Sequence, residues 1–576
     1  MTTTREQIDD ALRAHFARPD DPETTRALYA LIAGAPPHMV DAAMMDSIRA
    51  RPAVPEVEVV REPAPEAMPV LESIAGPRPE AVPAANWAGN IPLTGALNAF
   101  KVSDTDDVRA TIVQALAHNP NPTRNVLRAL GTTHSSSGVV ATPGTIVDTG
   151  VLVANGYPQG SLRKVAKVDP ATLRPGVDAS KLYQVGSGLR VREVIAALNA
   201  NGRALEMLGA YTGQTYVGAL CTGTHGSGIQ HGALHTALRA IELMFVDDTG
   251  QVVLRRIERS PGITDPTKVD PKTLIQDDGA VRAALVGVGS LGVVTSVVVE
   301  TVAPYNLQAD RIHRTWPEIR AILADVDANG YPKYFANTYT AGVLMNPYPW
   351  PLKPEGPRKG VINRGWIPAQ PPAHPEKPTV AGGCDLLFDV ARFLGNHTAL
   401  TPFILNLTID SMSSTTNIYG PWNEVLASSG NLPQGYSVEY SLPLSNYLPA
   451  LDAIFQTMYD IAWNETKMLA GTLSIRFVKG DDAYLSMAEG RDSVFLEFLT
   501  LAGINAAPDV FRAMETTALR FGARPHWGQW FDLNSMPSIV PLYGKASSFR
   551  DHGLDRFDKK GAFANDVSKK IRQFSP

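Results

Sequence analysis

The sequence predicts a protein of the α+β class with more than one domain. From Asn86 onward, short β-branched runs such as Thr145–Asp148 and Ala240–Val246 alternate with helical stretches such as Val191–Asn201. This alternation is typical of α/β or α+β domains, in which helices cover a sheet. A chain of 576 residues is also too long for a single compact core, so two or three domains are expected.

The first 85 residues differ from the rest in composition and in the spacing of their apolar residues. Residues 5–50 carry apolar side chains at three- and four-residue spacing, including Ile8, Leu12 and Phe16, which predicts helices. Residues 51–83 hold eight prolines among Glu, Ala and Val, a composition typical of an extended linker. We therefore expect residues 1–85 to form a helical extension and a tether.

The remainder divides into three expected parts: 86–305, 306–500 and 501–576. The first ends with a helix over 278–285 and a β-branched strand over 293–302. Residues 306–380 are rich in proline and aromatic residues, which favours loops packed over a site more than regular structure. Further along the second part, the pattern predicts strands at 437–443 and 473–477 and a helix at 448–461.

Composition excludes several classes of protein. The net charge of −5 and the lack of a Lys/Arg block argue against a nucleic-acid partner. The acidic N-terminus lacks the apolar segment of a secretory signal, and no run of 18 apolar residues occurs, so we expect a cytoplasmic chain without a membrane span. Two cysteines do not make a disulfide framework.

Two turns of small residues, each containing one histidine, are the most informative motifs. Residues 128–138 read RALGTTHSSSG, and residues 222–228 read TGTHGSG. Gly, Ser and Thr let backbone N–H groups approach a pyrophosphate closely, so the pair predicts a cofactor cradle. His134 in the first turn is the candidate for contact with the cofactor's ring, the alternative being a structural loop histidine.

Two other glycine motifs allow a nucleotide interpretation. Residues 287–292 match G-x-G-x-x-G, but a helix precedes them and a strand follows, the reverse of the order that a Rossmann site requires. Residues 185–191 lie between a strand and a helix but lack the third glycine. A plain strand-to-helix turn explains them equally well.

Metal and hydrolase sites have little support. His225, His231 and His235 have spacings that suggest a metal site, yet no cysteine or carboxylate stands at helpful spacing and glycines interrupt the segment. We therefore expect no metal. A G-x-S-x-G elbow is absent, so hydrolase chemistry has no anchor.

Taken together, these segments resemble the vanillyl-alcohol-oxidase/PCMH (VAO/PCMH) superfamily of FAD enzymes, in its aldonolactone-oxidase and alditol-oxidase branch. The likeness runs through most of residues 86–545 and includes N86-W-A-G-N90, the turn at 131–135, and R524-P-H-W-G528. It implies a PCMH-type FAD-binding domain of two α/β subdomains over 86–305. It also implies a substrate-binding cap on an antiparallel sheet over 306–500 and a C-terminal segment, 501–576, that returns to the flavin.

The resemblance also implies which residues hold the cofactor. His134 corresponds to the histidine that bonds covalently to the flavin 8α-methyl carbon, a substitution that raises the flavin potential and favours taking hydride from an alcohol. The pyrophosphate loops and the ring-contacting turn supply the other cofactor-binding residues. The full set is Gly131, Thr132, Thr133, His134, Ser135, Gly138, Gly218, Thr222, Gly223, Thr224, His225, Gly226, Ser227, Gly228, Gly289, Gly292 and Val293.

The substrate side departs from the family at two positions. The family usually has Glu-x-Arg where this chain has Ser474-Ile475-Arg476, and Lys where it has Gln529. Arg476 still supplies a permanent positive charge, whereas Ser and Gln are poor proton acceptors near pH 7. His526 is then the best base by residue type, although a structural role beside Trp527 is equally open. The expected catalytic residues are Arg476, His526, Gln529 and Ser474.

Three hypotheses follow. The first is an FAD-dependent oxidase or dehydrogenase that oxidises a CH–OH group of a small sugar-, lactone- or polyol-like substrate, with dioxygen or an electron carrier as acceptor. The second is a flavin-dependent oxidative cyclase, desaturase or dehydrogenase acting on a larger apolar substrate, with the 346–372 segment shaping the pocket. The third is a non-enzymatic FAD-bearing protein in which residues 1–50 dock a partner.

Overall fold

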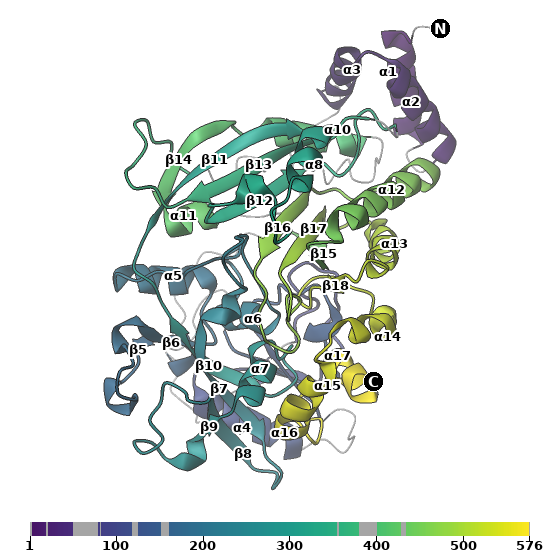
Figure 1. Cartoon of the computed structure of the whole chain (residues 1–576). Helices are drawn as coiled ribbons and strands as arrows, with labels where there is room; N and C mark the ends of the chain where they lie inside the picture. Colours follow the sequence, from purple (N-terminus) through teal and green to yellow (C-terminus); the bar gives the residue numbers. More distant parts are fainter. Residues whose placement is uncertain are drawn as a thin grey trace, which may run out of the picture.

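The computed structural model describes residues 3–18, 21–49, 79–80, 82–117, 125–150, 160–353, 356–378, 400–427 and 434–574. These residues form two α/β sheets, a large antiparallel sheet above them, and a small helical bundle at the N-terminus (Figure 1). This arrangement confirms the predicted α+β class. Among the described residues, no helix combines the length and the apolar character needed to cross a membrane.

The N-terminal bundle consists of α1 (Arg5–Ala17), α2 (Pro22–Gly34) and α3 (Pro37–Arg49), which confirms the helices predicted for residues 5–50. It packs against the cap: the ring of Tyr29 stacks on that of Trp463 with 6.2 Å between centroids. Almost all of the predicted linker, 51–83, lies outside the described residues.

The first α/β unit is a four-stranded sheet in the order β1-β2-β4-β3. Strands β2, β4 and β3 run parallel, and β1 is antiparallel to β2. The turn that carries His134 begins where β3 ends. The elements are β1 (Pro79–Glu80), β2 (Asn98–Lys101), α4 (Thr105–Ala117), β3 (Leu127–Leu130) and β4 (Thr145–Asp148).

The second α/β unit is a six-stranded sheet in the order β5-β6-β10-β7-β8-β9. Its β-branched central strand β10 pairs with β6 on one side and β7 on the other. As predicted, a helix (α7) precedes the glycine motif at 287–292 and a strand (β10) follows it. The elements are β5 (Val165–Lys167), β6 (Leu182–Gly186), α5 (Val191–Ala200), α6 (Tyr216–Cys221), β7 (Leu238–Val246), β8 (Val252–Glu258), β9 (Leu274–Gln276), α7 (Asp278–Leu285) and β10 (Val293–Glu300).

The cap is an eight-stranded sheet in the order β14-β11-β13-β12-β16-β17-β15-β18, and every pair in it is antiparallel. Helices α8, α12 and α13 lie beside it on the outer side of the molecule (Figure 1). Its elements are β11 (Asn306–Thr315), α8 (Trp316–Ala324), β12 (Thr340–Met345), β13 (Lys359–Trp366), α10 (Thr401–Asp410), β14 (Thr415–Pro421), α11 (Trp422–Leu426), β15 (Gly435–Pro443), α12 (Tyr447–Glu465), β16 (Leu473–Val478), β17 (Ser493–Leu501), α13 (Ala507–Leu519) and β18 (Arg524–Pro525).

The prediction that residues 306–380 are mainly loops is wrong. Strands β11, β12 and β13 and helix α8 occupy much of this stretch. The prolines gather in two places, the connection between β12 and β13 and residues 368–378 after β13. The others are Pro317 at the start of α8 and Pro332 before β12, so none of them interrupts a strand. Averaging the composition over the whole stretch hid the proline-free strands on either side.

The C-terminal residues return to the lower part of the molecule (Figure 1). The backbone N–H of Leu127 in β3 donates to the carbonyl of Ala562, at 2.7 Å. The segment therefore braces the strand that leads into the His134 turn. Its helices are α14 (Met536–Ile539), α15 (Ala546–Phe549), a π-helical turn (Arg550–Leu554), α16 (Asp555–Phe557) and α17 (Asp566–Gln573).

Candidate active site

A cavity of about 410 Å³ lies between the two α/β units and the inner face of the cap sheet. Its wall is built mainly from four parts of the chain: the turn after β3, residues 209–225, the turn before β10, and cap strands with the loop after β18. The residues predicted from sequence that line it are Gly131, Thr132, Thr133, His134, Ser135, Gly218, Thr222, Thr224, His225, Gly289, Gly292, Ser474, Arg476, His526 and Gln529.

The His134 side chain is held between two aromatic rings. The Trp87 ring centroid lies 4.3 Å from that of His134, and the Tyr211 centroid lies 4.7 Å away. The Tyr211 hydroxyl is 3.2 Å from His134 Nε2. Burial, reinforced by the positive charge of Arg190, lowers the pKa of His134 to about 3, so the ring is neutral near pH 7.

The motif at residues 86–90 fastens this turn. Asn86 Nδ2 donates to the carbonyl of Ser135 at 2.9 Å, and Asn90 Nδ2 donates to the carbonyl of Ser136 at the same distance. Thr133 adopts a left-handed backbone (φ 55°), which is uncommon for a residue with a β-branched side chain. These contacts give N86-W-A-G-N90 a clear local role: it holds the histidine turn in place.

The second small-residue loop, residues 222–228, lines the cavity with its first part and contacts the cap with its last part. Thr222, Thr224 and His225 line the cavity, whereas Gly226, Ser227 and Gly228 do not. Instead, Ser227 Oγ accepts the backbone N–H of Phe477 at 3.2 Å, and Gly228 N–H donates to the Phe477 carbonyl at 2.8 Å. The end of the loop thus joins the lower units to the cap. Gly138, Gly223 and Val293 are also absent from the cavity wall.

The turn at 287–292 approaches its neighbours closely. Gly292 has φ 150°, and a Cβ there would lie 2.4 Å from the Met244 carbonyl oxygen, so only glycine fits. Arg128 donates to the carbonyl of Gly289 and reaches the carbonyls of Phe563 and Ala564 at 3.2 and 3.1 Å. It therefore ties this turn to the C-terminal segment.

Two buried polar atoms on the cavity wall have no hydrogen-bond partner among the described residues: Ser187 Oγ and Arg128 Nε. Buried polar groups are normally paired, so such atoms indicate a polar ligand. Ser187 belongs to the turn after β6 and lies within the 185–191 motif, although it was not among the predicted cofactor-binding residues. A wall that combines these atoms with the small-residue turns and a neutral histidine fits FAD.

The cap contributes one row of side chains that crosses four strands. Ser474 on β16 is the register partner of Leu344 on β12 and of Glu497 on β17, and Glu497 is the partner of Glu439 on β15. Partners in register point to the same face of a sheet. These four residues, together with Arg476, therefore face the cavity as one group.

Arg476 lies between the two carboxylates of this row. Its Nη1 is 3.5 Å from Glu439 Oε1, and its Nη2 contacts Glu497 Oε2. Burial on its own lowers the pKa of Arg476, but the two carboxylates outweigh that effect and the net pKa is raised. Carboxylates directly opposite each other on paired strands repel, so this guanidinium stabilises the pair.

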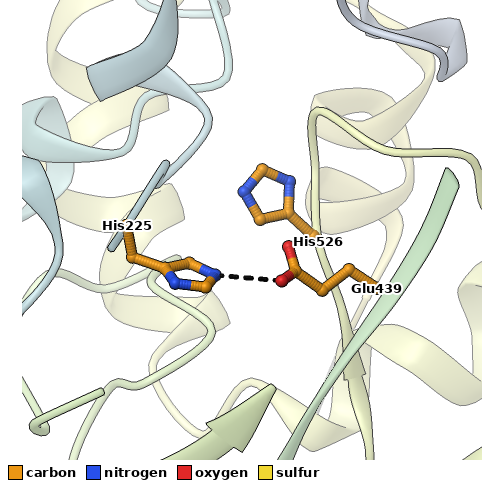
Figure 2. A group of neighbouring side chains, drawn as sticks. All are labelled: His225, Glu439 and His526. Carbon is orange, nitrogen blue, oxygen red and sulfur yellow. Dashed lines mark ion pairs between the residues drawn. The ribbon is translucent and has the colours of Figure 1, made fainter. Parts of the chain in front are cut away.

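His225 forms an ion pair with Glu439 (Figure 2). Its Nε2 is 3.3 Å from Glu439 Oε1, and its Nδ1 is 2.8 Å from the Gly226 carbonyl oxygen. Burial raises the pKa of Glu439, but His225, His526 and Arg476 together hold it below the usual range. Both ring nitrogens of His225 thus face oxygen acceptors, which fixes the orientation of the ring.

His526 is neutral and its tautomer is defined. The Gly528 N–H donates to His526 Nδ1 at 3.0 Å, so Nδ1 is the acceptor and Nε2 carries the proton. Burial, partly opposed by the Glu439 carboxylate, lowers the pKa of His526 to about 4. This geometry makes His526 a hydrogen-bond donor toward the cavity side, which weakens its candidacy as a base.

A pH-dependent stability follows from His526. Its pKa falls from the ordinary 6.5 to about 4 on folding, so the unfolded chain binds more protons between these values. The resulting stability, roughly 3 kcal/mol at most, is fully present above pH 6.5 and is lost as the pH falls through that window. We expect the unfolding free energy of His526→Asn to fall less steeply between pH 7 and pH 4 than that of the wild type, as measured by denaturant titration. The exposed His552→Gln serves as control, and equal slopes for wild type and His526→Asn would contradict the assignment.

The three histidines whose spacing suggested a metal site do not converge on one point. His225, His231 and His235 each turn to a different carboxylate: Glu439, Glu206 and Asp481, respectively. Among the described residues, the one grouping with metal-ligand chemistry is His225, Glu439 and His526, with ligand atoms within 4.8 Å of one another (Figure 2). Arg476, 3.5 Å from Glu439, brings a positive charge that disfavours a cation there.

Sequence reasoning missed Glu439, Glu497 and Tyr211, all of which line the cavity. One signal was present for the two glutamates: each is the only charged residue in an apolar stretch, SVEYSLP (a predicted strand) and VFLEFLTL (which was not predicted as a strand). Charged residues are rarely placed in such surroundings unless they are paired. Tyr211 had no comparable signal.

Comparisons with known proteins find relatives among sugar-lactone and alditol oxidoreductases. Residues 385–571 match the D-arabinono-1,4-lactone oxidase family. L-gulono-1,4-lactone dehydrogenase of Mycobacterium tuberculosis is 25% identical, with 77% of this chain and 90% of that protein covered. Alditol oxidase of a Streptomyces species is also 25% identical, with 83% and 96% covered. Cholesterol oxidase from B. sterolicum superposes with a TM-score of 0.64 at 14% identity, covering 88% of this chain and 99% of the other, which bears on the fold alone.

The fold and the cavity define an FAD-dependent oxidoreductase with a PCMH-type FAD-binding fold. In sequence, the chain resembles the aldonolactone and alditol oxidases, a branch of the VAO/PCMH superfamily.

Proposed function

We propose that the chain holds FAD covalently through His134 and oxidises a CH–OH group of a sugar-, lactone- or polyol-like substrate. The observation that carries this proposal is that His134, the 287–292 turn and the Arg476 carboxylate row meet at one cavity. When bound, FAD accepts the hydride of the carbinol carbon, and dioxygen or an electron carrier later removes the electrons.

His134 suits a covalent role because its ring is neutral and enclosed. A bond to the flavin methyl carbon requires the lone pair of an unprotonated ring nitrogen. The Tyr211 hydroxyl lies against Nε2, so we propose Nδ1 as the bonding atom. Gly131–Ser135 and Thr222–His225 would hold the pyrophosphate, and Gly289 and Gly292 would line the ring. Gly138, Gly223, Gly226, Ser227, Gly228 and Val293 would support these turns from behind.

On the substrate side, we propose that Arg476 stabilises negative charge as the substrate is oxidised, since a guanidinium stays protonated at any working pH. His526 Nε2–H would donate a hydrogen bond to the substrate oxygen or to Glu439. Gln529 Oε1 accepts the Ser437 hydroxyl at 2.6 Å, which fixes its amide beside the cavity. Gln529 and Ser474 would orient the substrate.

A larger apolar substrate is the second candidate, because part of the cavity wall is mainly apolar. Leu344, Leu405, Met412 and Leu499 line the cap side of the cavity, with Thr408 and Thr472 as polar neighbours. A polyol would find few partners there, and each hydroxyl left unpaired would cost about 1–3 kcal/mol. An alcohol with an apolar body would not.

The test of the function is anaerobic mixing of the purified protein with candidate donors while flavin absorbance is followed. We expect a CH–OH compound to bleach the bound flavin. Bleaching by lactones or polyols would support the first candidate, and bleaching only by alcohols with an apolar body would support the second. If no CH–OH donor bleaches a flavin that dithionite reduces readily, the proposed reaction is wrong.

A further inference from the structure

We propose that Glu497 accepts the proton of the substrate hydroxyl, and so takes over from the carboxylate that position 474 lacks. This inference rests on the proposed oxidation of a CH–OH group. Position 474 carries serine, which is a poor proton acceptor near pH 7, so it does not supply a base. The structure supplies a carboxylate one strand away.

The register of the cap sheet places Glu497 directly beside position 474. Glu497 on β17 is the direct partner of Ser474 on β16. Paired residues on antiparallel strands have Cβ atoms about 4.5–5.5 Å apart and point to the same face. A glutamate at 497 therefore brings its carboxylate into the volume that a glutamate at 474 would reach, and both positions line the cavity.

The contacts of Glu497 hold its carboxylate in place and leave it able to accept. Oε2 pairs with Arg476, and Oε1 accepts the Gln529 amide at 3.4 Å. Oε1 also lies 3.0 Å from Ser437 Oγ, whose one proton it shares with the nearer Gln529 Oε1. A carboxylate offers about four lone-pair sites, so a substrate hydroxyl can still bind. Its side chain is 15% exposed, whereas that of Glu439 is 2% exposed.

The other groups on the described wall do not suit this role. Glu439 is enclosed by His225 and Arg476. His526 carries its proton on Nε2, because Nδ1 accepts the Gly528 N–H. A serine or glutamine is a poor proton acceptor near pH 7. Glu497 is therefore the carboxylate that a substrate hydroxyl can reach.

In the proposed reaction, the O–H bond of the substrate breaks and its proton passes to a Glu497 carboxylate oxygen. When bound, FAD would accept the hydride from the C–H bond, and the carbinol carbon and oxygen would form a carbonyl. Arg476, bound to the same carboxylate, stabilises the negative charge that develops on the oxygen during this transfer.

A positional rescue tests the proposal. Glu497→Gln removes the acceptor but keeps the side-chain shape, and Glu497→Asp keeps the charge but withdraws it by one methylene. We expect the anaerobic reduction rate of Glu497→Gln to fall by roughly 10²-fold or more. In the double variant Ser474→Glu/Glu497→Gln, which moves the carboxylate back across the strand pair, most of that loss should be regained. Glu515→Gln, a buried carboxyl away from the cavity wall, should reduce at the wild-type rate.

Two further readouts separate a catalytic role from a structural one. Flavin content and the thermal midpoint should stay close to wild type in Glu497→Gln, and the product should still perturb the flavin spectrum on binding. If Glu497→Gln does not fold, Glu497→Asp must show the rate loss instead. A wild-type reduction rate in Glu497→Gln or Glu497→Asp, or no rescue by Ser474→Glu, would overturn the proposal. If the wild type itself is reduced by no alcohol or lactone, the proposed function fails, whatever Glu497 does.

Discussion

Arg476→Met is expected to slow flavin reduction by roughly 10²–10³-fold and to destabilise the cap. Arg476 is the one positive group placed between Glu439 and Glu497, which oppose each other in register across β15 and β17. Removing it takes away the charge that stabilises the developing oxyanion, which accounts for the rate. It also leaves two facing carboxylates uncompensated, at a cost of about 3–5 kcal/mol.

Two measurements check this result: the anaerobic reduction rate with a working donor, and the midpoint of denaturant unfolding. Arg476→Lys is the matched variant, because it keeps the charge but loses the two-pronged contact, so its losses should be smaller in both assays. An Arg476→Met protein with wild-type rate and stability would show that the carboxylate row is not part of the reaction site.

His134→Ala is expected to abolish covalent flavin while the protein still folds. The cavity wall loses one ring, but the turn remains fastened by Asn86, Asn90 and the backbone of Thr133. FAD should then be held only by reversible contacts and be released on denaturation. The loss of the imidazole substituent should also lower the flavin potential and slow substrate oxidation.

In-gel flavin fluorescence under denaturing conditions measures the bond, and a dye-equilibration titration measures the potential. Tyr211→Phe is the matched control: it removes the hydroxyl beside Nε2 but keeps Nδ1, so the fluorescent band should persist. A fluorescent band of wild-type strength in His134→Ala would place the bond on a different residue.

The local elements of the fold could be predicted from sequence because their signals are local. The helix at α7, the strand at β10 and their reversed order around the glycine motif follow from periodicity and β-branched composition. The three strands hidden in residues 306–380 could not be found in the same way. Their proline-rich connection dominates the composition of that stretch, and their partners lie far along the chain.

The cofactor side of the site was more predictable than the substrate side. The His134 turn carries its information in consecutive residues, so sequence alone could single it out, and the structure places it on the cavity wall. The acidic row depends on register between β15, β16 and β17, which brings Glu439 and Glu497 together only after the sheet has formed. The sequence, with serine at 474, therefore predicted a site without carboxylates, whereas the folded site contains Glu439 and Glu497.

The most direct test of the account is the visible spectrum of the purified wild-type protein, taken before acid precipitation and again on the separated pellet and supernatant. The account predicts a flavin spectrum in the native protein and yellow colour that stays with the pellet, because His134 bonds the cofactor. Colour that moves to the supernatant would contradict the covalent bond and leave a reversible FAD site. A colourless protein that takes up no added FAD would contradict the central claim that this cavity binds a flavin.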